Sequence, residues 1–340
     1  MRTTRLAMLA ACVVLTSCSG VDNGTESFSG AALGTAWSVK VTDLRRDLSR
    51  TIFEERITER IAAVDAAMST YRNDSELMQF NDYPSTDWFP VSRSVAAVVA
   101  EAIAISQLSR GAFDTTIQPL TELWGFGASG VRSRPPERSE VRQARSQTGN
   151  QKLQVRLNPP ALRKTASEIA VDLSGIAKGF AVDQVAALLD EHGSRNYLVE
   201  IGGELRAMGH NAQFKPWRIG VELPDPDATE FERIMPLQNQ GMATSGDYRN
   251  FFEDMGRRYS HTIDPRTGYP IRHNLAAVTV LADSAMRADA LATALLVMGL
   301  QDGRALAKRE NIAAIFIQRR DGRFESTDSP AMQQYLGGFE

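Results

Sequence analysis

The chain has 340 residues, of which 43% are hydrophobic and 23% charged, and its formal net charge is −3. This is the composition of an ordinary globular protein, and the length suits one large domain or two modest ones. The charge balance supplies no strong basic field, which argues against nucleic acid as a partner.

The first residues have the pattern of a bacterial export signal. Arg2 and Arg5 precede an apolar run that is too short to span a bilayer as a mature helix. The run ends in Leu15-Thr16-Ser17-Cys18, which resembles the lipobox of bacterial lipoproteins. We therefore predict that Cys18 is lipidated. The alternative is an ordinary signal peptide with an incidental cysteine.

The predicted domain organisation follows from this signal. Residues 1–17 form the signal peptide, residues 18–28 the lipidated cysteine and a flexible polar tether, and residues 29–340 a single folded domain. The other cysteine, Cys12, is removed with the signal. The mature fold is therefore expected to have no disulfide and no cysteine-bound metal.

Alternation and helical spacing predict the elements of the first half. Apolar and polar residues alternate over Thr35–Val41, which indicates a strand, and Ile52–Met68 has the spacing of an amphipathic helix. Asp74 is expected to cap a short helix over residues 75–81. Ser92 is expected to cap a longer one that stops at Gly111.

The second half mixes strands and helices without a regular βαβ rhythm, which predicts the α+β class. Residues 127–166 have the composition of an exposed helix and strand with loops. The remaining predicted elements are helices at Lys178–His192 and Ser284–Met298, the second ending at Gly299, and strands at Tyr197–Ile201, Trp217–Glu222, Ala276–Leu281 and 312–318.

The segment Val171–Asp183, VDLSGIAKGFAVD, is the first of several that could carry chemistry. A strand is expected to end at Asp172, and Lys178 is expected at the start of a helix. The free N–H groups of a helix N-terminus attract anions and a lysine adds a full charge, so the segment suits a phosphate or pyrophosphate. A tight turn with a solvated lysine is the alternative.

Two further segments combine glycine with polar residues. Gly202-Gly203 in EIGGEL suits a hairpin turn, or a close approach of a ligand to the backbone. Thr244 and Ser245 in ATSGDY could donate hydrogen bonds to a polar ligand or cap a turn.

The helix SAMRADALATALLVMG is apolar apart from Asp289 and Thr293, which lie four residues apart and hence on one face. A buried carboxylate requires a cation or hydrogen bonds, and a carboxylate with a hydroxyl suits Mg²⁺. The alternative is a helix face that touches water.

Two familiar site types do not fit the sequence. Ser174 and Lys178 have S-x-x-x-K spacing, which differs from the S-x-x-K motif of penicillin-recognising serine enzymes. None of the histidines has zinc-site spacing, and His192, at a predicted helix C-terminus, suits the helix dipole better than catalysis.

The turn Ser260–Ile271, SHTIDPRTGYPI, places His261 and Asp264 three residues apart among two prolines and a glycine. An imidazole titrates near neutral pH, so His261 is a candidate general base that Asp264 could orient. The alternative is a structural turn with a surface histidine.

Taken in order, these segments resemble the ApbE family of bacterial FAD:protein FMN transferases, which are periplasmic flavin-handling lipoproteins. The resemblance extends from about Leu33 to the C-terminus and implies an ApbE-like (T-fold-like) α+β architecture with a cofactor cleft between two lobes. The matching segments are Asp172–Asp183, Glu200–Glu204, Thr244–Gly246, His261–Pro270 and the helix of Asp289 and Thr293, together with Met68–Asn81 and Gly111–Leu120.

The resemblance implies Mg²⁺-dependent transfer of FMN from FAD to a threonine hydroxyl of a target protein, with release of AMP. It implies catalytic roles for His261, Asp264 and Asp289, and Mg²⁺ bound by Gly175, Asp289 and Thr293. Whether His261 or Asp289 is the base stays open. The cofactor-binding residues that it implies are Leu33, Tyr71, Ala112, Phe113, Asp114, Asp172, Lys178, Thr244, Ser245, Gly246 and His261.

One residue departs from the family pattern, because Leu33 stands where members usually carry methionine. Its similar volume predicts altered packing on the flavin with the site retained. The partner implied is a flavin-acceptor protein such as a subunit of a membrane redox complex. The lipid anchor implies a membrane-anchored protein facing the periplasm, at the inner or outer membrane. The alternatives are an FAD pyrophosphatase and a non-catalytic flavin-binding lipoprotein.

Overall fold

The computed structural model describes residues 24–45, 49–128, 130, 132–225, 230–248 and 250–339. The predicted signal peptide, the lipidation site Cys18 and most of the tether lie outside these residues. Within the described ranges, each helix is too short or too polar to cross a membrane.

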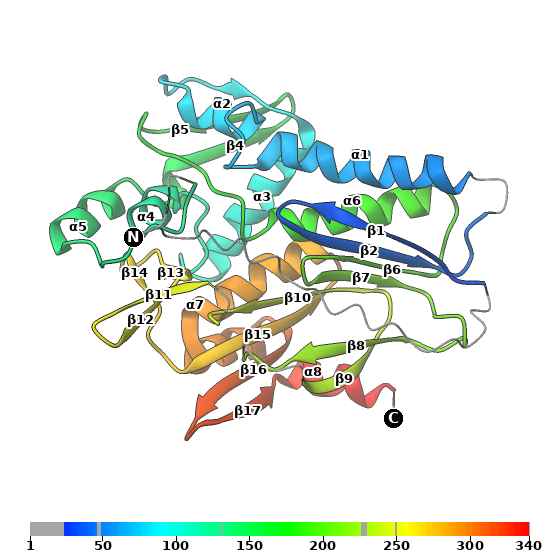
Figure 1. Cartoon of the computed structure of the whole chain (residues 1–340). Helices are drawn as coiled ribbons and strands as arrows, with labels where there is room; N and C mark the ends of the chain where they lie inside the picture. Colours follow the sequence, from blue (N-terminus) through cyan, green and yellow to red (C-terminus); the bar gives the residue numbers. More distant parts are fainter. Residues whose placement is uncertain are drawn as a thin grey trace, which may run out of the picture.

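An eight-stranded antiparallel sheet forms the centre of the described fold, with the order β1-β2-β6-β7-β10-β15-β16-β17 (Figure 1). The predicted α+β class is confirmed. The strands span β1 Glu26–Ala32, β2 Thr35–Val41, β6 Tyr197–Ile201, β7 Glu204–Met208, β10 Gln240–Gly246, β15 Leu275–Ala282, β16 Ala313–Arg320 and β17 Arg323–Asp328.

Helices α1, α3, α6 and α7 pack on one face of this sheet, and the other helices and the small sheets complete the fold. The helices are α1 Arg50–Met68, α2 Glu76–Asp82, α3 Arg93–Leu108, α4 Gln118–Leu123, α5 Arg138–Ser146, α6 Ala177–Glu191, α7 Ala285–Arg309 and α8 Pro330–Gly337, with a 3-10 turn at Asn150–Lys152. The small sheets are β3 Phe89–Pro90 with β4 Leu153–Leu157 and β5 Pro160–Lys164, β8 Trp217–Glu222 with β9 Phe231–Leu237, β11 Phe251–Asp254 with β12 Arg257–Ser260, and β13 Ile263–Asp264 with β14 Tyr269–Pro270.

The central sheet is buried on both faces, because successive side chains of a strand point to opposite sides. In β15, Val278 and Val280 belong to the main core with α1, α3, α6 and α7. Ala277 and Leu281 of the same strand belong to a second core, which β8, β9 and α8 cover. Strand β15 is therefore a nearly continuous apolar run, LAAVTVLA.

Helices α6 and α7 are packed unusually closely. A Cβ atom on Gly179 of α6 would stand 2.3 Å from the Ala285 carbonyl oxygen at the start of α7. The Asp183 carboxylate of α6 accepts hydrogen bonds from the backbone N–H groups of Ala285 (3.0 Å) and Met286 (2.9 Å). These groups have no partner within α7, so α6 caps α7 and holds it in place.

A third apolar cluster lies beside the sheet, where α4, α5 and the hairpins β11–β12 and β13–β14 meet (Figure 1). The Trp124 ring stacks on Tyr259 with 5.6 Å between centroids, and its Nε1–H donates to the Gly268 carbonyl at 2.9 Å. This cluster fixes the turn that carries His261 and Asp264.

Most predicted elements are confirmed, and two local predictions are wrong. Ser75 caps α2, since its hydroxyl accepts from the Met78 N–H at 3.1 Å, whereas Asp74 pairs with Arg72. The residues before Asp172 form no strand. The predicted helix end at Gly299 is confirmed: α7 continues to Arg309, but Gly299 breaks it with φ 75° and ψ 175°.

The substitution Gly179→Ala tests the close packing of α6 against α7. The new methyl group would overlap the Ala285 backbone, which cannot rotate away as a side chain could. We expect the free energy of unfolding, measured by denaturant titration, to fall by about 1–3 kcal/mol. Gly337→Ala in α8 is the matched control, because no atom lies within 4 Å of its Cβ position and stability should be kept. Equal stability of the two variants would contradict the packing argument.

Candidate functional site

Four of the predicted segments meet at one end of the central sheet. A Cβ on Gly202 would stand 2.8 Å from the Thr35 side chain, so the β6–β7 turn lies against the β1–β2 turn. Gly202 and Gly203 have φ 61° and 100°, which confirms the predicted hairpin turn. Met242 pairs with Leu205, and this antiparallel register brings the end of β10 to the same edge.

The three residues implied for a metal are gathered where α6 and α7 meet. Asp289 is 4% exposed, and its Oδ2 accepts the Gly179 N–H at 3.1 Å. One turn further along α7, the Thr293 hydroxyl oxygen lies 2.9 Å from the Ser245 hydroxyl oxygen. The same Thr293 oxygen lies 3.6 Å from the Cβ position of Gly175.

Thr244 does not join Ser245 at this place. Its hydroxyl is hydrogen-bonded to Thr279 of the neighbouring strand at 2.8 Å, and because side chains alternate along β10 it points to the face opposite α7. The structure therefore brings Ser245, and not Thr244, to the α6–α7 contact.

The oxygen atoms at this place fit a hard cation. The described residues contain no cluster of three or more histidine, cysteine or acidic side chains that could hold a metal. One carboxylate with a hydroxyl and a backbone carbonyl matches Mg²⁺ instead, because Mg²⁺ commonly keeps several waters and completes its shell with substrate phosphates. Asp289 and Thr293 provide the carboxylate and the hydroxyl, and the carbonyl of the neighbouring Gly175 would complete this donor set.

Lys178 forms an ion pair across the α6 N-terminus with Glu204 of β7. The lysine is therefore paired, although 35% of its side chain remains exposed. Glu204 is 2% exposed, and burial raises the pKa of its carboxyl to about 8. The charge of Lys178 opposes this rise, and the charge of Asp289 adds to it. The Oε2 atom of Glu204 is buried without a hydrogen-bond partner. The sequence analysis named Glu204 only as the last residue of the segment Glu200–Glu204. It did not predict that this acid is buried beside Lys178.

Asp172 and Tyr71 lie near each other at the edge of the site. The Asp172 carboxylate accepts from the Ser174 N–H at 2.8 Å, and burial raises its pKa. Partial burial, and then the charges of Asp172 and Glu122, raise the pKa of the Tyr71 hydroxyl. Tyr71 is nevertheless 72% exposed, so its ring is open to a planar ligand.

The segment from Ala112 to Asp114 is buried and packs against the site. Ala112 and Phe113 are buried, and the Phe113 ring lies 3.2 Å from the Cβ position of Gly175. Asp114 points inward, where it accepts from the Thr116 N–H (2.8 Å) and hydroxyl (2.6 Å) and from the Asn150 N–H (3.1 Å). Its carboxylate therefore holds its own loop, and burial raises its pKa.

Leu33 lies in the β1–β2 turn with φ 53°, an uncommon backbone conformation for a leucine. Its side chain is partly buried against the main core, close to the β6–β7 turn. Gly246 ends β10 beside Ser245.

The His261 ring is held by one backbone carbonyl. The Asn250 oxygen lies 3.0 Å from His261 Nδ1 and also accepts the His261 backbone N–H at 3.0 Å. Because a carbonyl only accepts, Nδ1 carries the proton and Nε2 keeps its lone pair in the neutral ring. Burial lowers the pKa of His261, the Asn250 bond and Asp247 raise it, and Lys178 lowers it.

Asp264 does not orient His261, and this prediction is wrong. Both of its carboxylate oxygens bind Arg266, from Nε at 2.9 Å and Nη2 at 3.0 Å. Its carbonyl accepts from the N–H groups of Thr267 (3.1 Å) and Gly268 (2.8 Å). Asp264 therefore closes its own turn, and Asn250 is the residue that orients the imidazole.

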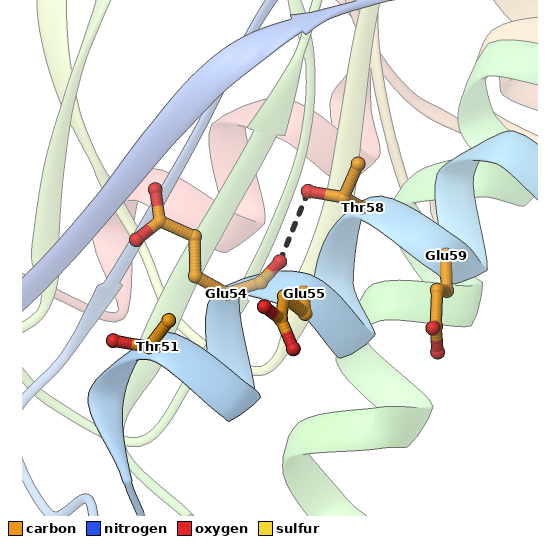
Figure 2. Close-up of a pocket in the computed structure, with 5 residues that line it drawn as sticks. All are labelled: Thr51, Glu54, Glu55, Thr58 and Glu59. Atoms are coloured by element: carbon orange, nitrogen blue, oxygen red, sulfur yellow. Dashed lines mark hydrogen bonds between the residues drawn. The ribbon is translucent and has the colours of Figure 1, made fainter.

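A surface hollow elsewhere carries none of the predicted site residues. It lies along the polar side of α1 and is lined by Thr51, Glu54, Glu55, Thr58 and Glu59 (Figure 2). The Thr58 hydroxyl donates to the Glu54 carbonyl within the helix at 3.0 Å. This acidic stripe is the solvated face of an amphipathic helix.

The sequence profile of the ApbE family matches residues 33–316. The chain belongs to the ApbE family. The FAD:protein FMN transferase of Haemophilus influenzae is 42% identical over 316 residues, covering 91% of this chain and 90% of that protein. The flavin transferase ApbE structure from Vibrio cholerae has a TM-score of 0.84 at 40% identity and covers 91% of this chain and 99% of that one.

A second solved structure is equally similar to this ApbE-family chain. It is the flavinyl transferase ApbE of Pseudomonas stutzeri in its apo form, with a TM-score of 0.84, 40% identity, and coverage of 92% of this chain and 97% of that one. The resemblance stated from the motifs is therefore confirmed, and so is the fold that it implied. The predicted cofactor cleft between two lobes stays a prediction.

The substitution Lys178→Met tests the buried charge network. Glu204 has a folded pKa of about 8, above its ordinary 4.5, so its contribution to stability decreases as pH rises through this interval. Without the lysine this pKa rises further. We expect the free energy of unfolding to fall by about 2 kcal/mol at pH 8 and by less at pH 5. The loss is smaller than for a fully buried ion pair because the lysine side chain is 35% exposed to solvent.

The double variant Lys178→Met/Glu204→Gln is the matched control, since it removes both charges of the pair. It should recover much of the stability and most of the pH dependence measured by denaturant titration. A loss in the single variant that is equal at pH 5 and pH 8 would contradict the network.

Proposed function

We propose that the chain transfers FMN from FAD to a threonine hydroxyl of an acceptor protein, with Mg²⁺ bound between α6 and α7 and AMP as the leaving group. Its relatives at about 40% identity are FAD:protein FMN transferases over nearly the full chain. This chain is an enzyme of that kind. The threonine target, the metal and the identity of the base are the specific parts of the proposal.

One observation supports the assignment of roles most directly. The charge of Lys178, at the start of α6, lowers the pKa of His261, which directly follows β12. The strand β10 also links the two places, because Ser245 of β10 lies 2.9 Å from Thr293 of α7 and Asn250, four residues after the end of β10, binds the His261 ring. This link supports a proposal in which a base, a helix N-terminus with a lysine, and hard oxygen ligands act on one substrate.

His261 is suited to accept the proton of the incoming hydroxyl. Burial lowers its pKa, so the ring is neutral near pH 7, and Asn250 leaves Nε2 as the accepting nitrogen. The threonine oxygen forms a bond to the phosphorus of the FMN half while its proton moves to Nε2. The bond from that phosphorus to the bridging oxygen breaks, and its electrons leave with AMP.

Other residues bind the two halves of the substrate. The N–H groups at the start of α6, together with Lys178, attract the pyrophosphate. Asp289, Thr293 and Gly175 would hold Mg²⁺, which when bound neutralises charge on the phosphate oxygens. The exposed ring of Tyr71 offers a stacking surface for the flavin. Full transfer activity in excess EDTA would contradict the metal requirement.

We further propose that Cys18 anchors the enzyme to the periplasmic side of a membrane, where its acceptor is located. The support is the Leu15–Cys18 sequence and the polar segment that follows it. We expect intact-mass analysis of membrane-extracted protein to give a mature chain that begins at an acylated Cys18. A mass that corresponds to unmodified Cys18 would contradict the anchor.

The assignment of His261 is tested by His261→Ala in an assay with FAD, Mg²⁺ and a threonine-bearing acceptor. Wild type should give a fluorescent, covalently flavinylated acceptor and one AMP for each flavin. The variant should lose about 10²-fold in kcat, the usual contribution of a positioned base, with a smaller change in FAD affinity.

His210→Ala is the matched control, because His210 packs on Phe214 outside the site and its loss should leave kcat unchanged. Near-wild-type turnover of His261→Ala would move the base role to Asp289. Free FMN with AMP from wild type would indicate a hydrolase, and unchanged FAD would indicate a carrier.

A further inference from the structure

We propose that Arg319 and Asp247 form a positioning pair that holds His261 in the orientation that the transfer reaction requires. Asp247 directly follows β10 and is 8% exposed. Arg319, near the end of β16, binds both of its carboxylate oxygens, with Nη1 3.0 Å from Oδ2 and Nη2 2.7 Å from Oδ1. Such a two-point contact fixes direction as well as distance. The inference rests on the proposed function, in which His261 is the base.

The backbone of Asp247 is fixed as firmly as its side chain. Its N–H donates to the Ala276 carbonyl of β15 at 3.1 Å. Its carbonyl accepts from Arg258 Nη2 of β12 at 2.8 Å. The Arg258 guanidinium in turn lies over the Phe251 ring, 3.8 Å from its centroid. Asp247 therefore connects the central sheet, through β15 and β16, to the β11–β12 hairpin.

This connection reaches His261 by two short routes. Asn250, three residues after Asp247, supplies the carbonyl that binds both His261 Nδ1 and the His261 backbone N–H. His261 also directly follows Ser260, the last residue of β12, and Arg258 of that strand is the residue bound to Asp247. A shift of Asp247 would therefore move the acceptor that selects the imidazole tautomer and the strand that carries the ring.

The pair also acts on the imidazole through its charge. Asp247 raises the pKa of His261, and Lys178 at the start of α6 lowers it. Arg319 and Arg258 both face Asp247 and offset part of its charge, while α4 and the turn that follows it present the Phe126 ring, 6.3 Å from the imidazole. Neutralising Asp247 should therefore lower the pKa of His261, and removing Arg319 should raise it.

These opposite directions distinguish a pair that is coupled to His261 from one that only stabilises the fold, and the kcat of Arg319→Lys then tests positioning. An ion pair that only stabilises the fold would lose stability in either variant without moving the histidine titration in opposite senses. The test is an NMR titration of the histidine ring signals in the full, flavin-free chain, with the His261 signal identified by its loss in His261→Ala. It uses no substrate, so it can fail while FMN transfer by the wild type is intact.

Three variants carry the experiment. Asp247→Asn should shift the His261 titration to lower pH and Arg319→Met to higher pH. Both should lower kcat for FMN transfer by about 10-fold to 100-fold with little change in KM for FAD, because a misplaced base affects the reaction more than binding. Arg319→Lys keeps the charge and loses the two-point contact, so it should keep the His261 pKa near that of wild type and restore kcat only in part.

Arg320→Met is the matched control. Arg320 is the next residue of β16, its side chain is 66% exposed, and it pairs with Glu325, so its loss should move neither the titration nor kcat. The inference is overturned if the His261 titration is unchanged in both Asp247→Asn and Arg319→Met, or if it moves in the same direction in both. If either variant fails to fold, Arg319→Lys decides: full wild-type kcat in that variant would overturn the inference.

Discussion

The contact between Gly179 and the start of α7 is the constraint on which the site depends. Because Gly179 has no side chain, α6 can approach the Ala285 backbone closely. The backbone N–H of Gly179 then reaches the buried Asp289 carboxylate. Asp183 then caps α7 from α6. The same approach brings Gly175, just before α6, to Thr293 on α7. A larger residue at position 179 would separate the donor set as well as the helices.

The acidic side chains at this contact are neutralised only in part by basic side chains of the protein. Two buried acids, Glu204 and Asp289, share the influence of one lysine, Lys178. Burial raises the pKa of both acids, and Glu204 keeps one oxygen without a hydrogen-bond partner. Buried acids of this kind are costly to the fold and cluster at functional sites, where they prepare a place for cations and for the phosphates that cations bind. The network is thus consistent with handling a pyrophosphate.

Sequence patterns predicted what depends on local spacing. Alternation located β2, an apolar run located β15, and apolar periodicity located α1, α6 and the first part of α7. Alternation within β10 could also have separated Thr244 from Ser245, since neighbouring strand residues face opposite ways. Asp74 and Ser75 are both good capping residues, and only the phase of the helix decides between them. The position of Gly299 as a helix break followed from glycine's access to positive φ.

Contacts between distant segments could not be predicted in the same way. Asp264 was expected to serve His261, but Arg266 is two residues away and takes both of its oxygens. The Asn250 carbonyl that orients the imidazole carries no side-chain signal. Glu204 was overlooked because a glutamate after a hairpin turn is usually solvated, and its burial depends on Lys178 of another element. These contacts are set by tertiary packing, which also joins Arg319 to Asp247.

Anomalous diffraction from crystals grown with FAD and Mn²⁺ tests the arrangement at α6 and α7 most directly. Mn²⁺ takes oxygen ligands like those of Mg²⁺ and gives a signal that locates the ion without assumptions about its ligands. We expect one strong peak about 2.2 Å from an Asp289 carboxylate oxygen and the Thr293 hydroxyl oxygen, beside the FAD pyrophosphate. A peak elsewhere, with Asp289 bound only to the Gly179 N–H and no ion at Thr293, would contradict the site described for this chain.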